Sequence, residues 1–208
     1  MALFITFEGG EGSGKSSALQ KIIMEFEKKN IPFILTREPG GTPIGEDIRS
    51  ILLSSNNKVM DIRTEALLFA ASRREHLKEK IWPSLEKGIN VLCDRYLDSS
   101  LAYQGKAREL GIDEVLNLNN FATENTMPDL TFFFDISPED GLKRIASNQR
   151  EINRLDKETI DFHHRVYEGY VELATRFPNR IKRIDASKDL DSVVDACLSI
   201  LKERIKGL

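Results

Sequence analysis

Cysteine is scarce in this chain, and no apolar run is long enough to cross a bilayer. Of 208 residues only two are cysteines, Cys93 and Cys197, so a disulfide framework of the kind that staples small secreted domains is excluded. A spanning helix needs about 18 consecutive apolar residues, and Glu8 interrupts the N-terminal apolar run before a secretory signal could form. We therefore expect buried thiols, no membrane partner and a cytoplasmic location.

An excess of one charge sign is also missing. Lysine and arginine number 30 against 33 for aspartate and glutamate, which gives a formal net charge of −3. Both signs are interspersed, so a nucleic-acid partner is not expected and any basic site must be local. The three histidines, His76, His163 and His164, form no H-E-x-x-H pattern, so we expect packed or solvated side chains there.

What the chain does contain is an alternation of short apolar runs with longer helical patterns. This alternation is typical of an α/β fold in which helices flank a parallel sheet, and the length fits one compact domain. The predicted strands are Leu3–Phe7, Phe33–Arg37, Asn90–Asp94, Leu130–Asp135 and Ile181–Asp185. The predicted helices are Lys15–Lys29, Pro43–Leu53, Arg63–Glu86, Ile112–Thr123, Pro138–Ala146, Lys157–Phe177 and Leu190–Lys206. Ligands of such sheets collect where the strands end, so the polar residues after each strand are the candidates for chemistry.

The first predicted strand is followed by a complete G-x-x-x-x-G-K-S motif that leads into a helical pattern. It reads Gly9-Gly10-Glu11-Gly12-Ser13-Gly14-Lys15-Ser16. The glycines let backbone N–H groups converge on phosphate oxygens, Lys15 can reach the terminal phosphates, and the Ser16 hydroxyl suits Mg²⁺. A glycine-rich turn without a ligand is the alternative, but the context of strand, loop and helix favours a nucleotide site. The GTPase motifs are missing, since Asn57-Lys58-Val59-Met60 lacks the required acid.

Arginines recur where the second and third predicted strands end. Arg37 and Arg49 flank the segment Glu38–Thr42, and Asp94-Arg95-Tyr96 ends the third strand. Because the carboxyl ends of parallel strands share one edge of the sheet, these groups suggest a second anion-binding locus that faces the phosphate loop. Asp94 is placed to act on the Mg²⁺ shell through water. Scattered, solvated surface charges are the alternative.

Phe69 and Arg73 are four residues apart within the predicted helix Arg63–Glu86. At this spacing they project from the same helix face. The ring could stack on a base while the guanidinium donates to a base carbonyl. Helix spacing alone favours a simpler interpretation, a core phenylalanine beside an exposed arginine.

Several motifs, taken together and in order, closely resemble those of the bacterial thymidylate kinase family. They are Glu8 with the phosphate loop, Arg37-Glu38-Pro39-Gly40-Gly41-Thr42, Asp94-Arg95-Tyr96 with Ser99-Ser100-Leu101-Ala102-Tyr103-Gln104-Gly105, and Asn153-Arg154-Leu155-Asp156. The resemblance extends from about Phe4 to Ser187. Many NTPases share the phosphate loop, whereas the E-P-G-G-T and S-S-x-A-Y-Q-G segments are specific to this family. On this resemblance, base recognition replaces the simpler interpretation of Phe69 and Arg73.

The resemblance implies a P-loop NTPase fold, built on a five-stranded parallel sheet with flanking helices. It implies an enzyme that transfers the γ-phosphoryl group of ATP to dTMP, which gives ADP and dTDP for nucleotide biosynthesis, with Mg²⁺ as cofactor. It also implies that Phe69 stacks on thymine, that Arg73 binds the exocyclic oxygen, and that Ser100 approaches the N3 edge with Gln104 nearby. Adenine is expected near Ala186.

The same resemblance implies how the acceptor nucleotide is held. Arg49 and Arg95 would bind its phosphate with help from Arg37, and Glu11 would address the sugar 3′-hydroxyl. Tyr103 would crowd the 2′ position, where a ribose hydroxyl would clash. These residues therefore predict a preference for a deoxyribonucleotide.

A short polar segment, residues 147–156, separates the last two long helical patterns before the C-terminal strand. It carries Arg150 and Arg154, and the resemblance implies that it is the lid and that these arginines act in catalysis with Lys15 and Arg95. Positive charge that covers the transferring group would also exclude water. An exposed loop is the alternative, and Asn153-Arg154-Leu155-Asp156 departs from the D-R-x-E that relatives often carry.

The sequence is compatible with three functions, of which a thymidylate kinase is the one the resemblance implies. A kinase for another nucleoside monophosphate is the nearest alternative, and a non-catalytic nucleotide-binding regulator is the more distant one. The resemblance also implies a homodimer formed through helices. Ala66, Leu67 and Ala70 could take part in it, but the same apolar positions would serve the core of a monomer.

Overall fold

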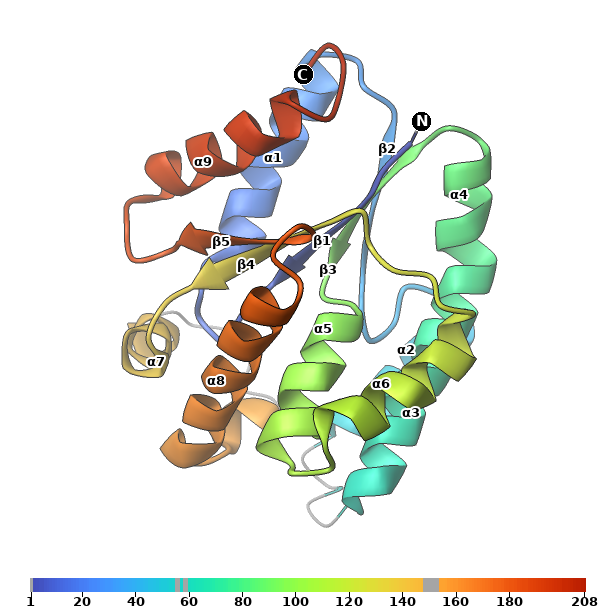
Figure 1. Ribbon diagram of the computed structural model, residues 1–208, viewed down its shortest axis with the longest axis vertical. Helices are drawn as coiled ribbons and strands as arrows, with labels where there is room; N and C mark the ends of the chain where they lie inside the picture. Colours follow the sequence, from blue (N-terminus) through green and yellow to red (C-terminus); the bar gives the residue numbers. More distant parts are fainter. Residues whose placement is uncertain (1, 55–56, 58–59, 148–153) are drawn as a thin grey trace.

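The computed structural model describes residues 2–54, 57, 60–147 and 154–208. Its centre is an all-parallel five-stranded sheet with the strand order β2-β3-β1-β4-β5 (Figure 1). The strands are β1 (Phe4–Glu8), β2 (Phe33–Arg37), β3 (Asn90–Asp94), β4 (Leu130–Asp135) and β5 (Ile181–Asp185). The predicted sheet is confirmed, with one shift, because Glu8 is the last residue of β1 instead of following it.

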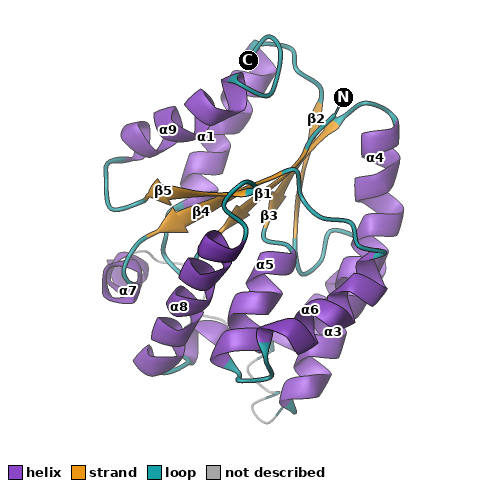
Figure 2. Cartoon of the chain, viewed as in Figure 1, coloured by secondary structure: helices purple, strands orange, loops and turns teal. Residues whose placement is uncertain are grey.

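Helices lie on both faces of this sheet (Figure 2). They are α1 (Lys15–Lys28), α2 (Pro43–Leu53), α3 (Ile62–His76), α4 (Trp82–Glu86), α5 (Leu97–Ser100), α6 (Ile112–Thr123), α7 (Pro138–Ser147), α8 (Ile160–Arg176) and α9 (Leu190–Lys202). Two π-helical segments, η1 (Leu77–Ile81) and η2 (Leu101–Ala107), and a short 3₁₀ segment, η3 (Leu155–Lys157), complete the described elements. No helix in these described ranges is both long and apolar enough to cross a membrane.

The long helix predicted for Arg63–Glu86 is interrupted. The π-helical η1 separates α3 from α4, and Pro83 stands at the start of α4. Proline has no N–H for the carbonyl of the preceding turn, and its ring crowds that carbonyl. The wider turn of η1 accommodates the ring, as π-bulges do inside helices.

Helix ends differ from their predicted positions where capping decides them. The helix predicted to begin at Lys157 begins at Ile160, because the Thr159 side chain accepts a hydrogen bond from the Phe162 N–H and caps it. The C-terminal helix ends at Lys202 and not at Lys206. The segment from Leu97 to Ala107 was not predicted as helical. Nearly all of its η2 side chains are buried, so it lacks the polar face that makes a helix visible in a sequence.

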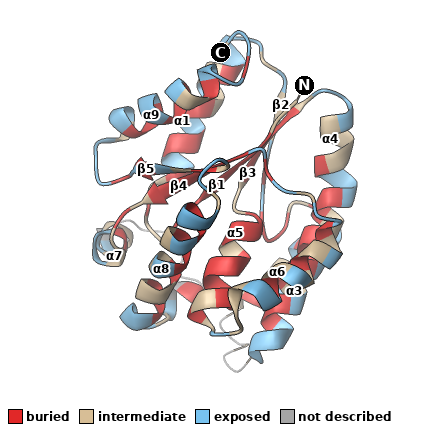
Figure 3. Ribbon diagram, viewed as in Figure 1, coloured by how far each residue is buried: buried red, intermediate tan, exposed pale blue. Residues whose placement is uncertain are grey.

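Successive side chains of a strand point to opposite faces of the sheet and pack into two separate hydrophobic cores. Ile5 and Phe7 of β1 pack with α1 and α9 on one face of the sheet, whereas Phe4 packs with α3, η2 and α8 on the other. Figure 3 shows the sheet and the inward sides of the helices as buried. Cys93 and Cys197 are free and buried, one in each core, which confirms the prediction of buried thiols.

The strand register determines which chain segments meet. Asp94 at the end of β3 pairs with Phe7 of β1 on one side and with Arg37 of β2 on the other. The chain leaves these three strands at the same edge. The phosphate loop and the arginine-bearing segments therefore begin side by side.

Candidate active site

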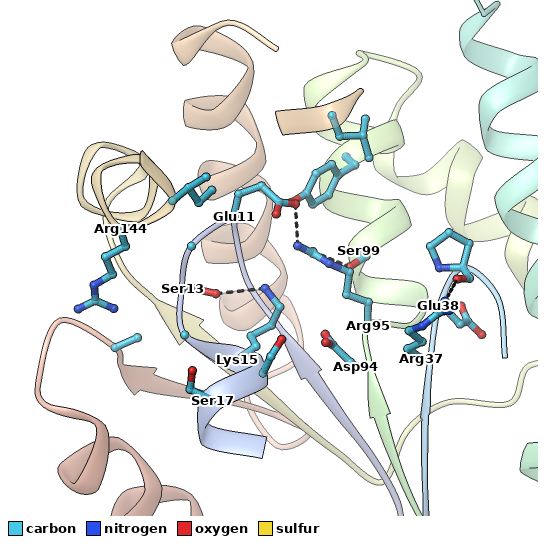
Figure 4. A pocket seen from close by; sticks show the side chains of 18 of the residues that line it. Glu11, Ser13, Lys15, Ser17, Arg37, Glu38, Asp94, Arg95, Ser99 and Arg144 are labelled. Atoms are coloured by element: carbon cyan, nitrogen blue, oxygen red, sulfur yellow. Dashed lines mark hydrogen bonds and ion pairs between the residues drawn. The ribbon is translucent and has the colours of Figure 1, made fainter. Parts of the chain in front are cut away.

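A cavity of about 760 Å³ opens at the carboxyl edge of the sheet. Its walls come from the phosphate loop after β1, from residues 37–39 at the end of β2, from Asp94 and Arg95, and from Ala186 and residues 188–190 after β5. Figure 4 shows members of the first three groups around the opening, among them Lys15, Glu38 and Asp94. The expectation that polar residues after the strands gather in one place is confirmed.

Glycine is required in the phosphate loop for close packing and for backbone shape. A Cβ on Gly12 would lie 2.0 Å from the carbonyl oxygen of Gly141, so the loop packs directly on the backbone of α7. Gly14 is the N-cap residue of α1 and adopts a left-handed conformation with no side-chain cap. The N–H groups of the first turn of α1 are therefore open to an anion, and that turn, described in full, carries no acidic side chain.

Lys15 lies folded against the loop that precedes it. Its Nζ donates to the carbonyl oxygens of Gly9 and Gly10, both at 3.0 Å, and to Ser13 Oγ at 3.1 Å (Figure 4). Burial, followed by the nearby charge of Arg95, lowers the pKa of Lys15 to about 8. Carbonyl and hydroxyl acceptors hold the ammonium loosely compared with a phosphate, so its charge is available to a nucleotide.

Asp94 and Ser16 form the part of the cavity wall that suits a divalent cation. Asp94 Oδ1 is buried, and no hydrogen-bond donor for it exists among the described residues. The exposed Ser16 lines the same cavity. An unpaired carboxylate oxygen and a hydroxyl that line one cavity fit a hydrated Mg²⁺, which binds few protein oxygens and keeps several waters.

Arg37 and Arg49 lie next to each other on the β2 side of the cavity. Each guanidinium donates from Nη1 to the carbonyl oxygen of Pro39 at 2.9 Å, and Arg37 also donates to Glu46 at 3.0 Å. Burial, together with the neighbouring charge of Arg37, lowers the pKa of Arg49. Two guanidinium groups that bind the same carbonyl oxygen bring two positive charges close together. Such a pair is a favourable binding site for a phosphate dianion.

Arg95 lies between Glu11 of the phosphate loop and Arg37 (Figure 4). Its Nη2 donates to Glu11 Oε1 at 2.8 Å, and its Nη1 donates to the Gly9 carbonyl oxygen at 3.0 Å. Glu11 also accepts a hydrogen bond of 3.0 Å from the hydroxyl of Tyr103. Four of the predicted site residues, Gly9, Glu11, Arg95 and Tyr103, are thus joined by hydrogen bonds.

A buried carboxyl, Glu8, supports Arg95 from behind. Glu8 accepts hydrogen bonds from Ser99 Oγ at 2.6 Å and from the Tyr170 hydroxyl at 2.9 Å. The same two oxygens receive Arg95 Nη1 at 3.2 and 3.3 Å. Burial, followed by the negative charge of Asp98, raises the pKa of Glu8 to about 7. Glu8 therefore orients Arg95 through two hydroxyl groups without touching it.

The remaining wall carries the residues expected to meet a base. Phe69, Ser100, Tyr103 and Gln104 all line the cavity, and all four side chains are buried in the protein wall. Phe69 projects from α3, and the other three come from α5 and η2. The structure brings them together as predicted, while their roles toward a nucleotide stay predictions.

Arg73 lies behind the cavity wall, whereas the resemblance implies that it contacts the base. It is 1% exposed and is not part of the cavity wall. Its Nε donates to Glu38 at 2.8 Å, and its Nη1 donates to Ser100 Oγ at 3.1 Å and also to Asn119 Oδ1. In this structure Arg73 reaches the cavity through Ser100, so direct binding of a base oxygen stays a prediction.

The predicted lid, residues 147–156, is described only in part. Arg150 and Asn153 lie outside the described residues. Arg154 is not in the cavity wall, and its guanidinium donates to Glu65 at 2.5 Å and to the Leu52 carbonyl oxygen at 3.0 Å. Arg144, by contrast, lines the cavity from α7, on the side of the phosphate loop (Figure 4).

Sequence reasoning gave no site role to three buried carboxyls that support the cavity. Glu8 is a charged residue at the end of an apolar strand, and Glu38 belongs to the E-P-G-G-T segment. Glu65 precedes Phe69 and Arg73 by one and two helical steps of four residues, so it shares their helix face. The position of each carboxyl in the sequence indicates that it lies near the site. The sequence does not show which arginine each carboxyl binds.

Fold and site together define a P-loop kinase that acts on a phosphorylated acceptor. A strand leads through the glycine-rich loop into a helix, and arginines face that loop across one cavity. The model of the thymidylate kinase family matches residues 7–197. The chain therefore belongs to the thymidylate kinase family.

Individual relatives agree over nearly their whole length. Thymidylate kinase of Bacillus velezensis is 55% identical over 207 residues, which are 99% of this chain and 98% of the relative. The enzyme of Clostridium novyi is 53% identical over 200 residues, 96% of this chain and 98% of the relative. The enzyme of Oceanobacillus iheyensis is 55% identical over 210 residues, 99% of this chain and 93% of the relative.

Proposed function

We propose that ATP and dTMP meet end to end in the cavity, with the transferred phosphoryl group between the phosphate loop and Arg95. Membership of the family makes the reaction the ATP-dependent phosphorylation of dTMP to dTDP. The observation that carries the proposal is that Lys15 and the arginines of the β2 and β3 ends line one cavity, with Asp94 between them (Figure 4). Cationic groups would hold both polyanions.

The acceptor phosphate needs no general base. Its second pKa is near ~6, so at neutral pH it is already largely a dianion. The barrier is the approach of one anion to another, and catalysis consists of positioning and charge neutralisation. Arg37, Arg49 and Arg95 would hold the acceptor phosphate, while Lys15 and the N-terminus of α1 would hold the donor phosphates.

Other groups would complete the donor side. Mg²⁺ would be held by Ser16 and, through water, by Asp94, and would neutralise charge on the ATP phosphates. Arg144 lines this side of the cavity and is a further source of positive charge. Arg150 and Arg154 keep their predicted catalytic role as lid residues, and adenine would lie near Ala186.

The wall opposite the phosphates would select the acceptor. Phe69 would stack on the pyrimidine, with Ser100 and Gln104 at its hydrogen-bonding edge. Glu11 would accept a hydrogen bond from the sugar 3′-hydroxyl. Tyr103 is held against Glu11 and Arg95, and a ring held in place at the 2′ position would exclude a ribose hydroxyl.

The function is tested by ADP release across the nucleoside monophosphates. We expect dTMP to be phosphorylated with a kcat/KM at least about 100-fold above those of uridylate, guanylate and adenylate, because base stacking and the 2′ contact are both specific. Preference for another monophosphate would favour a different nucleotide kinase. ATP binding without turnover on any of them would favour a regulator.

We further propose a single kinase domain over residues 1–208, with its lid at about 147–156, acting in the cytoplasm as a homodimer. Leu67 of α3 is 55% exposed and Phe121 of α6 is 88% exposed, and the two helices lie side by side (Figure 1). Exposed apolar side chains on neighbouring helices mark a surface suited to a second copy. Ala66 and Ala70 are buried in the core instead.

Replacing Phe121 by serine should weaken this dimer. Burial of a phenylalanine ring contributes about 1.5–3 kcal/mol, and a twofold interface contains the ring twice, so we expect the dissociation constant to rise at least ~100-fold. Sedimentation equilibrium measures it. M24S, which removes an apolar side chain that is 64% exposed on α1, is the control and should sediment as the unmodified protein does. A monomeric unmodified protein would contradict the proposal.

A further inference from the structure

Glu65 is a buried carboxyl that the proposed mechanism does not use. It is 1% exposed on α3. Its Oε1 accepts a hydrogen bond from Gln104 Nε2 at 2.8 Å, and its Oε2 accepts one from Arg154 Nη2 at 2.5 Å. Arg108 donates to both oxygens at 3.4 and 3.5 Å. A carboxyl with this many donors is fully engaged, and of its partners among the described residues only Gln104 also lines the cavity.

The charge state of Glu65 follows from these partners. Burial raises the pKa of Glu65, but the charge of Arg108 and the hydrogen bonds from Gln104 and Arg154 outweigh it, so the pKa lies below its ordinary value. Glu65 is therefore a carboxylate at neutral pH. Arg108 is itself bound by Glu158 at 2.5 Å, which keeps the group of charges balanced in the interior.

An ionised carboxylate fixes the orientation of the Gln104 amide. A carboxylate has only acceptor oxygens, whereas an amide presents donors at its nitrogen and acceptors at its oxygen. The nitrogen of Gln104 must therefore face Glu65, and a reversed amide would set two acceptors against each other. Oε1 is then the hydrogen-bond acceptor that Gln104 can offer to a ligand in the cavity, which Gln104 lines.

We propose that Glu65 is a positioning residue that presents the Gln104 carbonyl oxygen to the acceptor base and makes the site prefer bases with an N–H donor at N3. Thymine and uracil carry that donor, whereas cytosine carries a lone pair at N3. The inference rests on the proposed function, in which the base stacks on Phe69. With cytosine in place, either two acceptors meet or Gln104 turns its oxygen toward Glu65. Either arrangement leaves buried polar atoms mispaired.

The isosteric variant E65Q tests the proposal. The introduced amide can donate as well as accept, so Gln104 can turn either way. We expect the KM for dTMP to rise about 10-fold, and the ratio of kcat/KM for dTMP over dCMP to fall by about 10-fold or more. Because Glu65 also binds Arg154, which has a proposed catalytic role, any change in kcat should be the same for both acceptors. The KM for ATP should not change. A purely structural role would lower thermal stability and affect both acceptors equally.

A reciprocal exchange and a matched control sharpen the test. In E65Q/Q104E the amide and the carboxylate trade places, so an oxygen again faces the base, and the dTMP over dCMP ratio should recover relative to E65Q. E158Q removes a carboxylate from Arg108 without touching Gln104 and should keep the ratio of the unmodified protein. If E65Q does not fold, E65D keeps the charge but withdraws it from Gln104, and we expect an intermediate loss of the ratio.

The outcomes separate this inference from the proposed function. Failure of the unmodified protein to phosphorylate or bind dTMP would overturn the function itself. A folded E65Q that keeps the original dTMP over dCMP ratio, in a protein that phosphorylates dTMP, would overturn only the role of Glu65. Equal loss for both acceptors without recovery in E65Q/Q104E would also overturn it.

Discussion

Replacing Arg95 by alanine should lower kcat for dTMP phosphorylation by about 10³-fold or more, because an arginine on a transferring phosphoryl group is worth this much in phosphoryl transfer. Arg95 joins the two halves of the cavity through Glu11 and the Gly9 carbonyl oxygen. Without the guanidinium, the acceptor phosphate would face the negative charge of Glu11 and the phosphates of ATP. Its KM should therefore rise as well.

Steady-state kinetics with both substrates varied measure this effect. R95K keeps a positive charge but loses the planar fork that contacts several acceptors at once, so its kcat should fall between those of R95A and the unmodified protein. R176A is the control, because Arg176 pairs with Asp113 on the surface and lies outside the cavity wall. A kcat of R95A within a few-fold of the unmodified value would remove Arg95 from the mechanism.

Replacing Lys15 by methionine should lower kcat by about 10³-fold, since it removes a fixed positive charge where negative charge develops. The pH dependence of the reaction gives a second test of the role of Lys15. Its pKa is lowered to about 8, so the ammonium loses its proton as the pH rises through that value. Above this pH, kcat/KM for ATP should fall up to tenfold per pH unit, because this parameter reports groups of the free enzyme.

Variants on the same helix separate this effect from general alkaline loss. K15R keeps its charge to high pH and should lack the alkaline decline even if its overall rate is lower. K21A removes a lysine that pairs with Asp191 on the surface, and it should show the unmodified profile. An unmodified enzyme whose kcat/KM for ATP stays level to pH 10 would contradict the assignment to Lys15.

Buried carboxyls hold the arginine side chains at and behind the cavity wall in fixed orientations. Glu8 orients Arg95 through Ser99 and Tyr170, and Glu38 binds Arg73 directly. Glu65 binds Arg108 and Arg154. A carboxyl that holds a guanidinium in place reduces the entropy lost when a phosphate or base binds. The site is therefore arranged before its ligands arrive.

The parts of the fold that could be predicted are those set by local periodicity. The strands β2, β3, β4 and β5 have their predicted bounds. β3 and β4 are short and mostly apolar, and all four strands contain the β-branched or aromatic residues that favour strands. The phosphate loop was recognisable because its glycines and Lys15 must occupy fixed spacings to surround phosphate. The η2 segment was missed because it is buried on all sides and has no polar face.

Local pattern alone therefore determined the sheet, the phosphate loop and the edge at which polar residues collect. Only the tertiary structure decided that Arg73 lies behind Ser100 and that Arg154 pairs with Glu65. The partners in these pairs are 27 and 89 residues apart in sequence. A helix face shows which side chains point the same way, but burial and ion pairing depend on what another segment brings to that face. That information arises only when the helices dock on the sheet.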